Sequence, residues 1–292
     1  MKLITLQADG IERIGVLEGE SVRVFGAADD KHPTMNELIG YVTGKGWEAA
    51  NEWLGESRLV PLNSVKILAP IPRPLKNIFC VGKNYREHAK EFHLSGFDAT
   101  SASSVPDLPI VFSKPATTVI GPLDTIPGHL DPTESVDYEN ELAVIIGKGG
   151  RGISKDKAYE HVFGYTIVND VTSRKLQNLH KQWFLGKGID GFCPMGPAIL
   201  TADSVPDVRT MKLQTFVNGE LRQDAVVADL IFDIPTLIET ISRTTTLEPG
   251  DIIATGTPAG VGIGFTPPKF LIKGDVVKVA IDPIGEMWNT VG

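Results

Sequence analysis

The sequence predicts a β-rich α+β protein, and three features of the chain support this fold class. Short apolar runs rich in β-branched residues outnumber the segments with helical spacing. The helical segments are few and short, which is typical of sheet-dominated α+β domains. A proline-rich stretch at residues 69–74 is stiff and extended, and it separates a small N-terminal α+β unit, residues 1–70, from residues 71–292.

The N-terminal unit contains predicted strands at residues 1–7, 13–17 and 22–25, with Gly and Asp turns between them. Apolar residues recur with helical spacing at residues 36–42 and 47–53. Because this unit holds no cluster of acids or histidines, we expect it to serve packing or dimerisation.

The next part of the chain begins with a strand at residues 77–81 and a helix that starts after Asn84. Residues 92–109 are rich in Ser, Asp, Gly and Pro, and a loop of this length is typical of a lid or a disordered insert. A short strand at residues 110–115 and extended pieces at residues 117–131 lead into an acidic strand, residues 136–147.

The remaining part is predicted to alternate strands, short helices and Gly-rich loops. Strands are expected at residues 162–169, 251–254 and 276–281, with an Asn-Gly hairpin at residues 215–222. Helices are expected at residues 155–160, at residues 173–183 with Thr172 as N-cap, and from Asp233 to about residue 242. Residues 187–197 and 255–262 are expected to be loops.

Composition excludes several classes of function. The net charge is −8 and no Lys/Arg cluster is present, which argues against nucleic acid or an anionic membrane as partner. No apolar run approaches the ~20 residues of a membrane span, and the N-terminus lacks a signal-peptide core. Cys80 and Cys193 belong to no CxxC motif, as expected for free thiols in a reducing cytoplasm. The Gly loop at residues 255–262 is no Walker A sequence, so we predict no nucleotide site.

The acidic strand is the strongest chemical feature of the chain. Side chains alternate along a strand, so Glu139 and Glu141 should point to one side, with Asp137 two residues further back. Two carboxylates a few ångströms apart repel by up to ~4 kcal/mol at an effective dielectric near 20. Unless a cation is present, one of them must take up a proton. A solvated edge strand is the alternative, but these acids run directly into an apolar core strand, which favours a divalent metal.

Asp170 ends the strand at residues 162–169 and completes a set of three hard oxygen ligands. Because no His or Cys accompanies Glu139, Glu141 and Asp170, the set favours Mg²⁺ or Mn²⁺ over zinc or copper. The alternative is that Asp170 only caps the following helix.

His88 and Glu91, three residues apart, should share a helix face. An imidazole oriented by a carboxylate suits a general base, although a surface pair with no function is the alternative. Arg174 and Gln177 should likewise share a helix face. No Ser or Cys occurs in a nucleophile-elbow sequence, so covalent acyl catalysis has no support.

Five spans resemble, in the right order, the successive motifs of the fumarylacetoacetate hydrolase superfamily: NYREHAKE, DYENELAVIIG, GYTIVNDVTSRKLQ, GKGIDGFCPMGP and GDIIATGTPAGVG. The similarity covers residues 71–292, and residues 1–70 resemble the small leading domain of many bacterial members. The resemblance implies a mixed β-roll, a homodimer, and Mg²⁺ or Mn²⁺ as cofactor.

The resemblance also implies roles for individual residues. By motif position, the metal ligands are Glu139, Glu141 and Asp170, and the catalytic residues are Lys187 and the dyad His88–Glu91 on a mobile lid. The positions that contact the substrate or shape its pocket are Arg174, Gln177 and Thr257.

Family members hydrolyse acylpyruvates, decarboxylate oxaloacetate, tautomerise enols or hydrate dienoates, and in most of them a 2-oxo acid chelates the metal and an enolate leaves or forms. The span HKQWFLGKGID and the C-terminal residues 260–292 are similar to bacterial members that act on oxaloacetate. We therefore predict cleavage of a carbon–carbon bond in a small 2-oxo acid, by acylpyruvate or fumarylpyruvate hydrolysis or by oxaloacetate decarboxylation. The alternatives are a tautomerase or isomerase of oxaloacetate or a hydroxymuconate-type acid, and a binding homologue without activity. The long segment at residues 92–109 departs from the smallest acylpyruvases.

Overall fold

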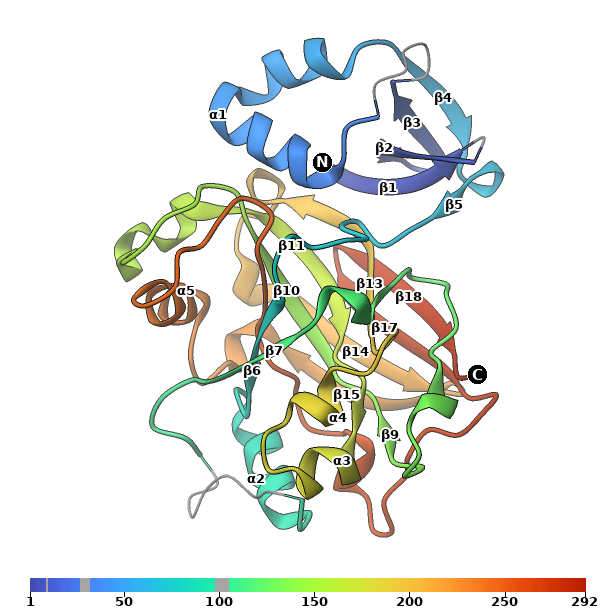
Figure 1. Cartoon of the computed structure of the whole chain (residues 1–292), viewed down its shortest axis with the longest axis vertical. Coiled ribbons are helices and arrows are strands. Elements are labelled where there is room, and N and C mark those ends of the chain that lie inside the picture. Colours follow the sequence, from blue (N-terminus) through green and yellow to red (C-terminus); the bar gives the residue numbers. More distant parts are fainter. Residues whose placement is uncertain (9, 27–31, 98–104) are drawn as a thin grey trace.

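The computed structural model of the chain describes residues 1–8, 10–26, 32–97 and 105–292. Figure 1 shows an elongated molecule with the N-terminal unit at one end and the helices α2 (Arg86–Leu94), α3 (Arg174–Leu179) and α4 (Phe184–Lys187) at the other. Sheets dominate the structure, which confirms the predicted β-rich α+β class.

The N-terminal unit is an antiparallel sheet with one helix beside it. Its strands are β1 (Lys2–Ala8), β2 (Ile11–Glu18), β3 (Ser21–Phe25) and β4 (Ser57–Pro61), and the short β5 (Lys66–Ile67) pairs with β1. The sequence predicts two helices here and misses β4. The structure confirms two helical stretches, described together as α1 (Met35–Leu54) and separated by a kink at Gly46, whose φ of 83° is left-handed. Thr34 and Glu37 close a capping box at its start.

The sheet of this unit continues into the rest of the molecule, because Lys2 and Leu3 of β1 pair with Leu200 and Ile199 of β13 (Cys193–Thr201). The strand order then runs β13, β11 (Val162–Asn169), β10 (Asn140–Ile146), β16 (Ile252–Ala254), β6 (Ile78–Gly82) and β7 (Ile110–Lys114). The sheet is mixed, since β16 runs parallel to β6, and β8 (Val119–Ile120) runs parallel to β13. The division at residue 70 stays a prediction.

A second sheet packs against the first. Its order is β15 (Glu220–Val226), β14 (Lys212–Val217), β17 (Val276–Asp282) and β18 (Gly285–Thr290). Leu142, Val144 and Ile146 of β10 belong to the core that includes this sheet, whereas Ala143 and Ile145 belong to the core that includes α1. Burial on both faces explains why β10 is apolar at every position after Glu141.

Several segments differ from the sequence prediction. The predicted helix at residues 173–183 is divided into α3 (Arg174–Leu179) and α4 (Phe184–Lys187), because Lys181 has a left-handed φ of 59°. Thr172 does not cap it: its hydroxyl donates to the carbonyl oxygen of Asp170, within the short strand β12 (Thr172–Ser173). The predicted loop at residues 187–197 is wrong for its second half, which belongs to β13.

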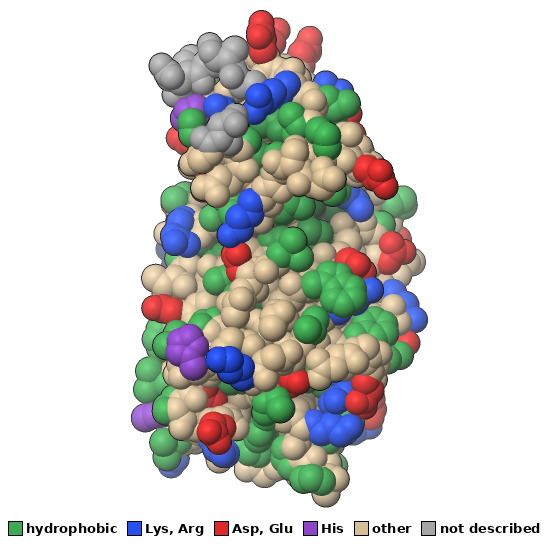
Figure 2. Space-filling view, turned by 90° about the vertical axis from the view of Figure 1, so that its right-hand side faces the viewer, with side chains coloured by type: hydrophobic (Ala, Val, Ile, Leu, Met, Phe, Trp, Pro, Cys, Tyr) green, Lys and Arg blue, Asp and Glu red, His purple; other side chains and the backbone are tan. Residues whose placement is uncertain are grey.

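The helix α2 (Arg86–Leu94) extends into the predicted loop at residues 92–109, of which residues 98–104 lie outside the described part. The predicted helix at residues 155–160 is a 3₁₀ segment, Lys155–His161, and α5 (Ile234–Ser242) is capped by Asp233 as predicted. None of the helices in the described ranges is long and apolar enough to cross a membrane. On the face in Figure 2, basic and acidic side chains are interspersed, and the described residues form no broad basic patch there.

Candidate active site and metal centre

Three buried carboxylates meet where β10 begins and β11 ends. Glu141 belongs to β10, Glu139 precedes it, and Asp170 directly follows β11. The antiparallel pairing of Asn140 with Asn169 brings these positions side by side. One oxygen of each acid lies within 4.8 Å of the others. The three predicted ligands therefore lie together, and their binding of a metal stays a prediction.

Asp137 does not belong to this cluster. The sequence predicts one strand over residues 136–147, which would place Asp137 on the same side as the other two acids. The structure instead has a separate short strand, β9 (Val136–Asp137), which pairs with β12, whereas β10 pairs with β11. The break between β9 and β10 ends the alternation, and Asp137 turns its oxygens toward Arg174 and Gly262.

Lys187 and Arg174 surround Glu139 with positive charge. Nζ of Lys187 lies 2.7 Å from Oε2 of Glu139 and 2.7 Å from Oδ2 of Asp170. Nη1 of Arg174 lies 2.6 Å from Oε1 of Glu139. Both oxygens of Glu139 therefore face a cation, and the ammonium group of Lys187 lies between two of the three acids.

Lys114 is a further buried cation that the sequence pattern does not single out. Its Nζ lies 2.8 Å from Oδ1 of Asp170 and donates to the carbonyl oxygens of Val171 and Lys187. It thereby joins the end of β11 to the C-terminal end of α4 and fixes Asp170 relative to Lys187.

These charges move the pKa values of two acids in opposite directions. Burial opposes ionisation of Glu139, but the ammonium of Lys187 and the guanidinium of Arg174 outweigh it and lower the pKa of Glu139 to about 2. Burial raises the pKa of Glu141 well above its usual value, and the charges of Asp170 and Glu139 raise it further. Burial also opposes ionisation of Lys187, but Asp170 and Glu139 outweigh it and raise the pKa of Lys187.

Glu141 indicates most clearly that the cluster fits a metal ion. Within the described ranges its side chain accepts one hydrogen bond, from the N–H of Gly256 at 2.8 Å, and forms no ion pair. A buried carboxyl group next to two carboxylates must hold a proton or face a cation. Three carboxylate oxygens without His or Cys suit Mg²⁺ or Mn²⁺. The residues present therefore fit the predicted metal.

His88, which is buried, and Glu91, which is half-buried, form a pair on α2. His88 is 4% exposed, and its Nδ1 lies 3.1 Å from Oε2 of Glu91. Glu91 also accepts a hydrogen bond from the backbone N–H of Gly260. A carboxylate on Nδ1 favours the tautomer that carries hydrogen there, which leaves Nε2 as the basic nitrogen. The pair therefore has the arrangement that a general base requires, an imidazole oriented by a carboxylate, and its imidazole is not solvent-exposed.

A narrow cavity of about 10 Å³, roughly the space that one water molecule needs, brings most of the predicted site residues together. Seven of them line it: His88, Glu139, Glu141, Arg174, Gln177, Lys187 and Thr257. Glu91 lies behind His88, and Asp170 lies behind Lys187. The wall also contains residues that the sequence pattern does not indicate: Val81, Gly82, Lys83, Phe92, Phe112 and Trp183. Its aromatic side chains form an apolar boundary around the charged groups.

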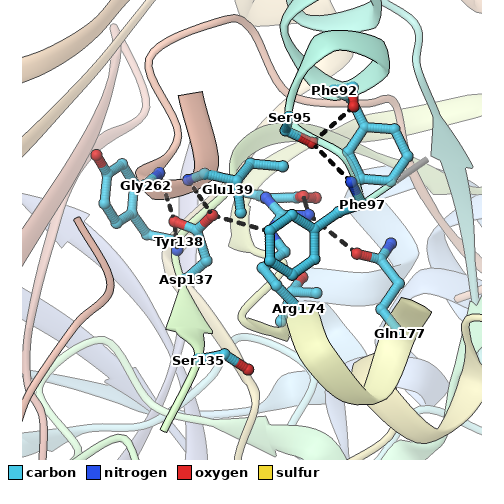
Figure 3. A network of polar contacts seen from close by, with 12 residues as sticks. Phe92, Ser95, Phe97, Ser135, Asp137, Tyr138, Glu139, Arg174, Gln177 and Gly262 are labelled. Atoms are coloured by element: carbon cyan, nitrogen blue, oxygen red, sulfur yellow. Dashed lines mark hydrogen bonds and ion pairs between the residues drawn. The ribbon is translucent and has the colours of Figure 1, made fainter. Parts of the chain in front are cut away.

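Two side chains of this cavity are oriented by polar contacts. Nη1 of Arg174 donates to Oε1 of Gln177 at 3.3 Å, as Figure 3 shows, whereas Nη2 is buried without a hydrogen-bond partner among the described residues. The hydroxyl of Thr257 accepts from Nε2 of Gln223, a buried residue that no sequence pattern marks. Arg174 therefore offers the cavity an unused donor that suits an anionic ligand.

Comparison with known proteins identifies relatives of the chain. The family model for the C-terminal domain of fumarylacetoacetate hydrolase matches residues 77–292. The curated relative oxaloacetate tautomerase YisK of Bacillus subtilis (strain 168) is 54% identical over 242 residues, which cover 83% of this chain and 78% of the relative.

Solved structures resemble the whole chain. A fumarylacetoacetate hydrolase from the psychrophilic Exiguobacterium antarcticum is 41% identical with a TM-score of 0.84, covering 100% of this chain and 99% of that chain. A maleylpyruvate hydrolase from Sphingobium sp. SYK-6, solved with manganese(II) and pyruvate, is 33% identical with a TM-score of 0.79, covering 100% and 98%.

Proposed function

Because this chain belongs to the fumarylacetoacetate hydrolase family, we propose that it is a metal-dependent enzyme that interconverts the enol and keto forms of oxaloacetate or a similar 2-oxo dicarboxylate. The observation that carries this proposal is that His88, paired with Glu91, lines the same cavity as Glu139 and Glu141 of the acid cluster. The similarity to a relative named oxaloacetate tautomerase supports this substrate and reaction.

The cofactor we propose is Mg²⁺ or Mn²⁺, held by Glu139, Glu141 and Asp170. When bound, such an ion acts as a Lewis acid that polarises the 2-oxo group and attracts the neighbouring carboxylate. The manganese in the solved maleylpyruvate hydrolase supports this choice. Lys187 forms ion pairs with Glu139 and Asp170 and balances part of their negative charge.

The cations of the cavity suit a substrate with two negative charges. Nη2 of Arg174 has no partner among the described residues, so it can donate a hydrogen bond to a substrate carboxylate. Gln177 orients the same guanidinium through Nη1. Charge complementarity of this kind selects anions and fixes their orientation. We therefore assign the second carboxylate of the substrate to Arg174.

Tautomerisation moves one proton between C3 and the 2-oxygen and breaks no bond between carbon atoms. His88 lines the cavity with a carboxylate on its Nδ1, so its Nε2 can accept that proton and return it. Phe92, Phe112 and Trp183 exclude water around the transfer. Lys187 is engaged with two acids, so we give it a role in charge balance and not in proton transfer.

Carbon–carbon bond cleavage, which the sequence pattern favours, is the second candidate. The similarity to a maleylpyruvate hydrolase supports carbon–carbon bond cleavage. The same groups of the cavity would serve in tautomerisation and in cleavage. Hydrolysis differs in one requirement, because His88 would have to activate a water directed at the distal carbonyl. A binding homologue without activity is disfavoured by the complete acid cluster and the intact pair.

A side-by-side assay with Mg²⁺ or Mn²⁺ separates the candidates. It measures ketonisation of enol-oxaloacetate, decarboxylation of oxaloacetate, and cleavage of acetylpyruvate and fumarylpyruvate. We expect ketonisation to exceed the other rates. Acylpyruvate cleavage that is orders of magnitude faster would replace the tautomerase proposal with the hydrolase, and turnover of no substrate would leave the binding homologue.

A further inference from the structure

Asp137 is the acid of the 137–141 stretch that lies outside the metal cluster, and its side chain is completely buried. Both of its oxygens accept hydrogen bonds, and Figure 3 shows the carboxylate between Gly262 and Arg174. Oδ2 accepts from Nε of Arg174 at 2.8 Å and from the N–H of Ile263 at 3.1 Å. Oδ1 accepts from the N–H of Gly262 at 2.6 Å. One carboxylate thus holds both a cavity arginine and a glycine-rich loop.

The same loop, residues 260–264, holds Glu91. The N–H of Gly260 donates to Oε1 of Glu91 at 3.0 Å and to Oε2 at 3.3 Å. A Cβ atom on Gly264 would lie 1.8 Å from Oε1, so this close approach requires glycine. Tyr138, which follows Asp137, donates from its hydroxyl to the carbonyl oxygen of Gly260 at 2.8 Å. The loop is therefore attached to β9 on one side and to the carboxylate behind His88 on the other.

Arg174 depends on Asp137 for its orientation. Nε is held by Asp137, and Nη1 is held by Glu139 and Gln177, which together fix the plane of the guanidinium. Nη2 is the nitrogen that this arrangement leaves for a ligand. Loss of the contact at Nε would let the guanidinium rotate about its remaining contacts and would misdirect Nη2.

We propose that Asp137 is a positioning residue that couples Arg174 to the His88–Glu91 pair. The proposal rests on the proposed function, in which Arg174 binds a substrate carboxylate and His88 carries a proton. Asp137 is neither among the residues that line the cavity nor one of the three clustered acids. It fixes the group that binds the carboxylate relative to the group that carries the proton, and positioning of this kind strongly affects rate.

The variant Asp137→Asn tests this coupling with little change of shape. An amide has one acceptor oxygen, so it cannot accept from both Arg174 and Gly262 as the carboxylate does. We expect kcat/KM to fall by ~10–100-fold, the usual range for loss of a hydrogen bond to a charged group. KM should rise because Arg174 is misdirected, and kcat should fall because Glu91 loses its fixed loop.

The matched control is Asp251→Asn. Asp251 is also a buried acid that accepts a backbone N–H, from Glu248, and pairs with a lysine, Lys76. Neither partner lines the cavity. This change should leave kcat and KM within about twofold, as expected for a residue distant from the chemistry. An equal loss in both variants would show that Asp137 acts only through general stability and would overturn the proposal.

Double-mutant cycles then distinguish coupling from independent effects. Asp137→Asn is combined with Arg174→Lys, which lacks Nε, and separately with Glu91→Gln. The loss in each double variant should be smaller than the product of the single losses. Additive losses in both cycles would overturn the proposal. The rise in Tm on adding Mn²⁺ should persist in Asp137→Asn, and loss of that rise would place Asp137 in the metal site instead.

Amide hydrogen exchange gives a readout that needs no substrate. Exchange at Gly260, Gly262 and Ile263 should be faster in Asp137→Asn than in wild type or Asp251→Asn. If wild type turns over no substrate, the proposed function fails, and unchanged exchange would separately overturn the coupling. If Asp137→Asn does not fold, Gly262→Ala replaces it, because its Cβ would lie 2.5 Å from the carbonyl oxygen of Lys269 and 2.7 Å from Oδ1 of Asp137 and would displace the loop from both. That variant should lower kcat more than it raises KM, and unchanged kcat would contradict the proposal.

Discussion

Nζ of Lys187 lies 2.7 Å from Oε2 of Glu139, so a buried ammonium group contacts one of the carboxylates proposed to bind the metal. The same ammonium contacts Asp170 at 2.7 Å. In the metal-free protein it supplies part of the positive charge that the acid cluster requires. With a divalent ion present, it balances the charge that remains and repels that ion.

Lys187→Met should therefore have opposite effects with and without metal. The metal-free variant should lose ~3–5 kcal/mol of unfolding free energy, as when one partner of a buried ion pair is removed. Its rise in Tm on adding Mn²⁺ should exceed that of wild type, because no ammonium repels the ion. Thermal unfolding with and without MnCl₂ measures both quantities. A smaller rise than in wild type would mean that Lys187 assists metal binding.

Glu141→Gln should stabilise the metal-free protein near neutral pH. The pKa of Glu141 is raised on folding, so its favourable contribution to stability is present below the unfolded pKa of about 4.3 and is lost as pH rises toward the folded pKa. Each unit of pKa difference corresponds to about 1.4 kcal/mol. Glutamine does not ionise and should avoid this loss. Urea unfolding in EDTA between pH 4 and pH 8 measures the difference.

The same variant should no longer be stabilised by Mn²⁺, because one of three charged ligands is absent. Asn36→Ala, which changes a residue outside the cavity, serves as a control that keeps the response to Mn²⁺. A full Mn²⁺ response in Glu141→Gln would place Glu141 in a supporting role.

Glu139→Gln should show the opposite dependence on pH. The pKa of Glu139 is lowered to about 2, so its contribution to stability is present above about pH 4.3 and is lost as pH falls toward 2. The variant should be less stable than wild type at pH 7, and this difference should shrink between pH 4 and pH 2. Acid unfolding of both metal-free proteins measures it. A difference that stays constant over that range would contradict the assigned charge of Glu139.

His88→Ala should lower turnover by ~10²–10⁴, the usual range for lost general acid–base catalysis. The acid cluster does not include His88, so the rise in Tm on adding Mn²⁺ should be nearly unchanged. Steady-state kinetics and thermal unfolding check the two statements. Turnover close to wild type would mean that α2 only covers the cavity.

A homodimer stays a prediction from the family resemblance. Sedimentation equilibrium should give twice the 31.6 kDa mass of one chain. A single-chain mass at micromolar concentration would contradict it.

The sequence predicts the acid cluster because the pattern that encodes it is local. Apolar runs mark β10 and β11 as buried strands, and Glu139, Glu141 and Asp170 occur at the ends of these runs. The spacing of His88 and Glu91 on α2 is equally local. The ordered motifs of a known family add Lys187, Arg174, Gln177 and Thr257, whose roles no single spacing indicates.

The parts that the sequence does not predict depend on distant partners. Asp137 meets Arg174 only because β9 pairs with β12, and an isolated acid gives no sign of that pairing. In the sequence, Lys114 is only a lysine at the end of a strand. Its role depends on the contact with Asp170, which is 56 positions further along the chain. β13 contains prolines that suggest a loop, yet it is held as a strand between β1 and β11.

Ketonisation of enol-oxaloacetate is the reaction that most directly tests metal-dependent tautomerisation by this protein. Its rate is followed by ultraviolet absorbance with wild-type protein and Mn²⁺, after EDTA, and after Mn²⁺ is restored. We expect a rate well above that of buffer with Mn²⁺, a fall to the buffer rate with EDTA, and recovery when Mn²⁺ returns. A rate no greater than buffer, in protein whose raised Tm shows that Mn²⁺ is bound, would contradict it.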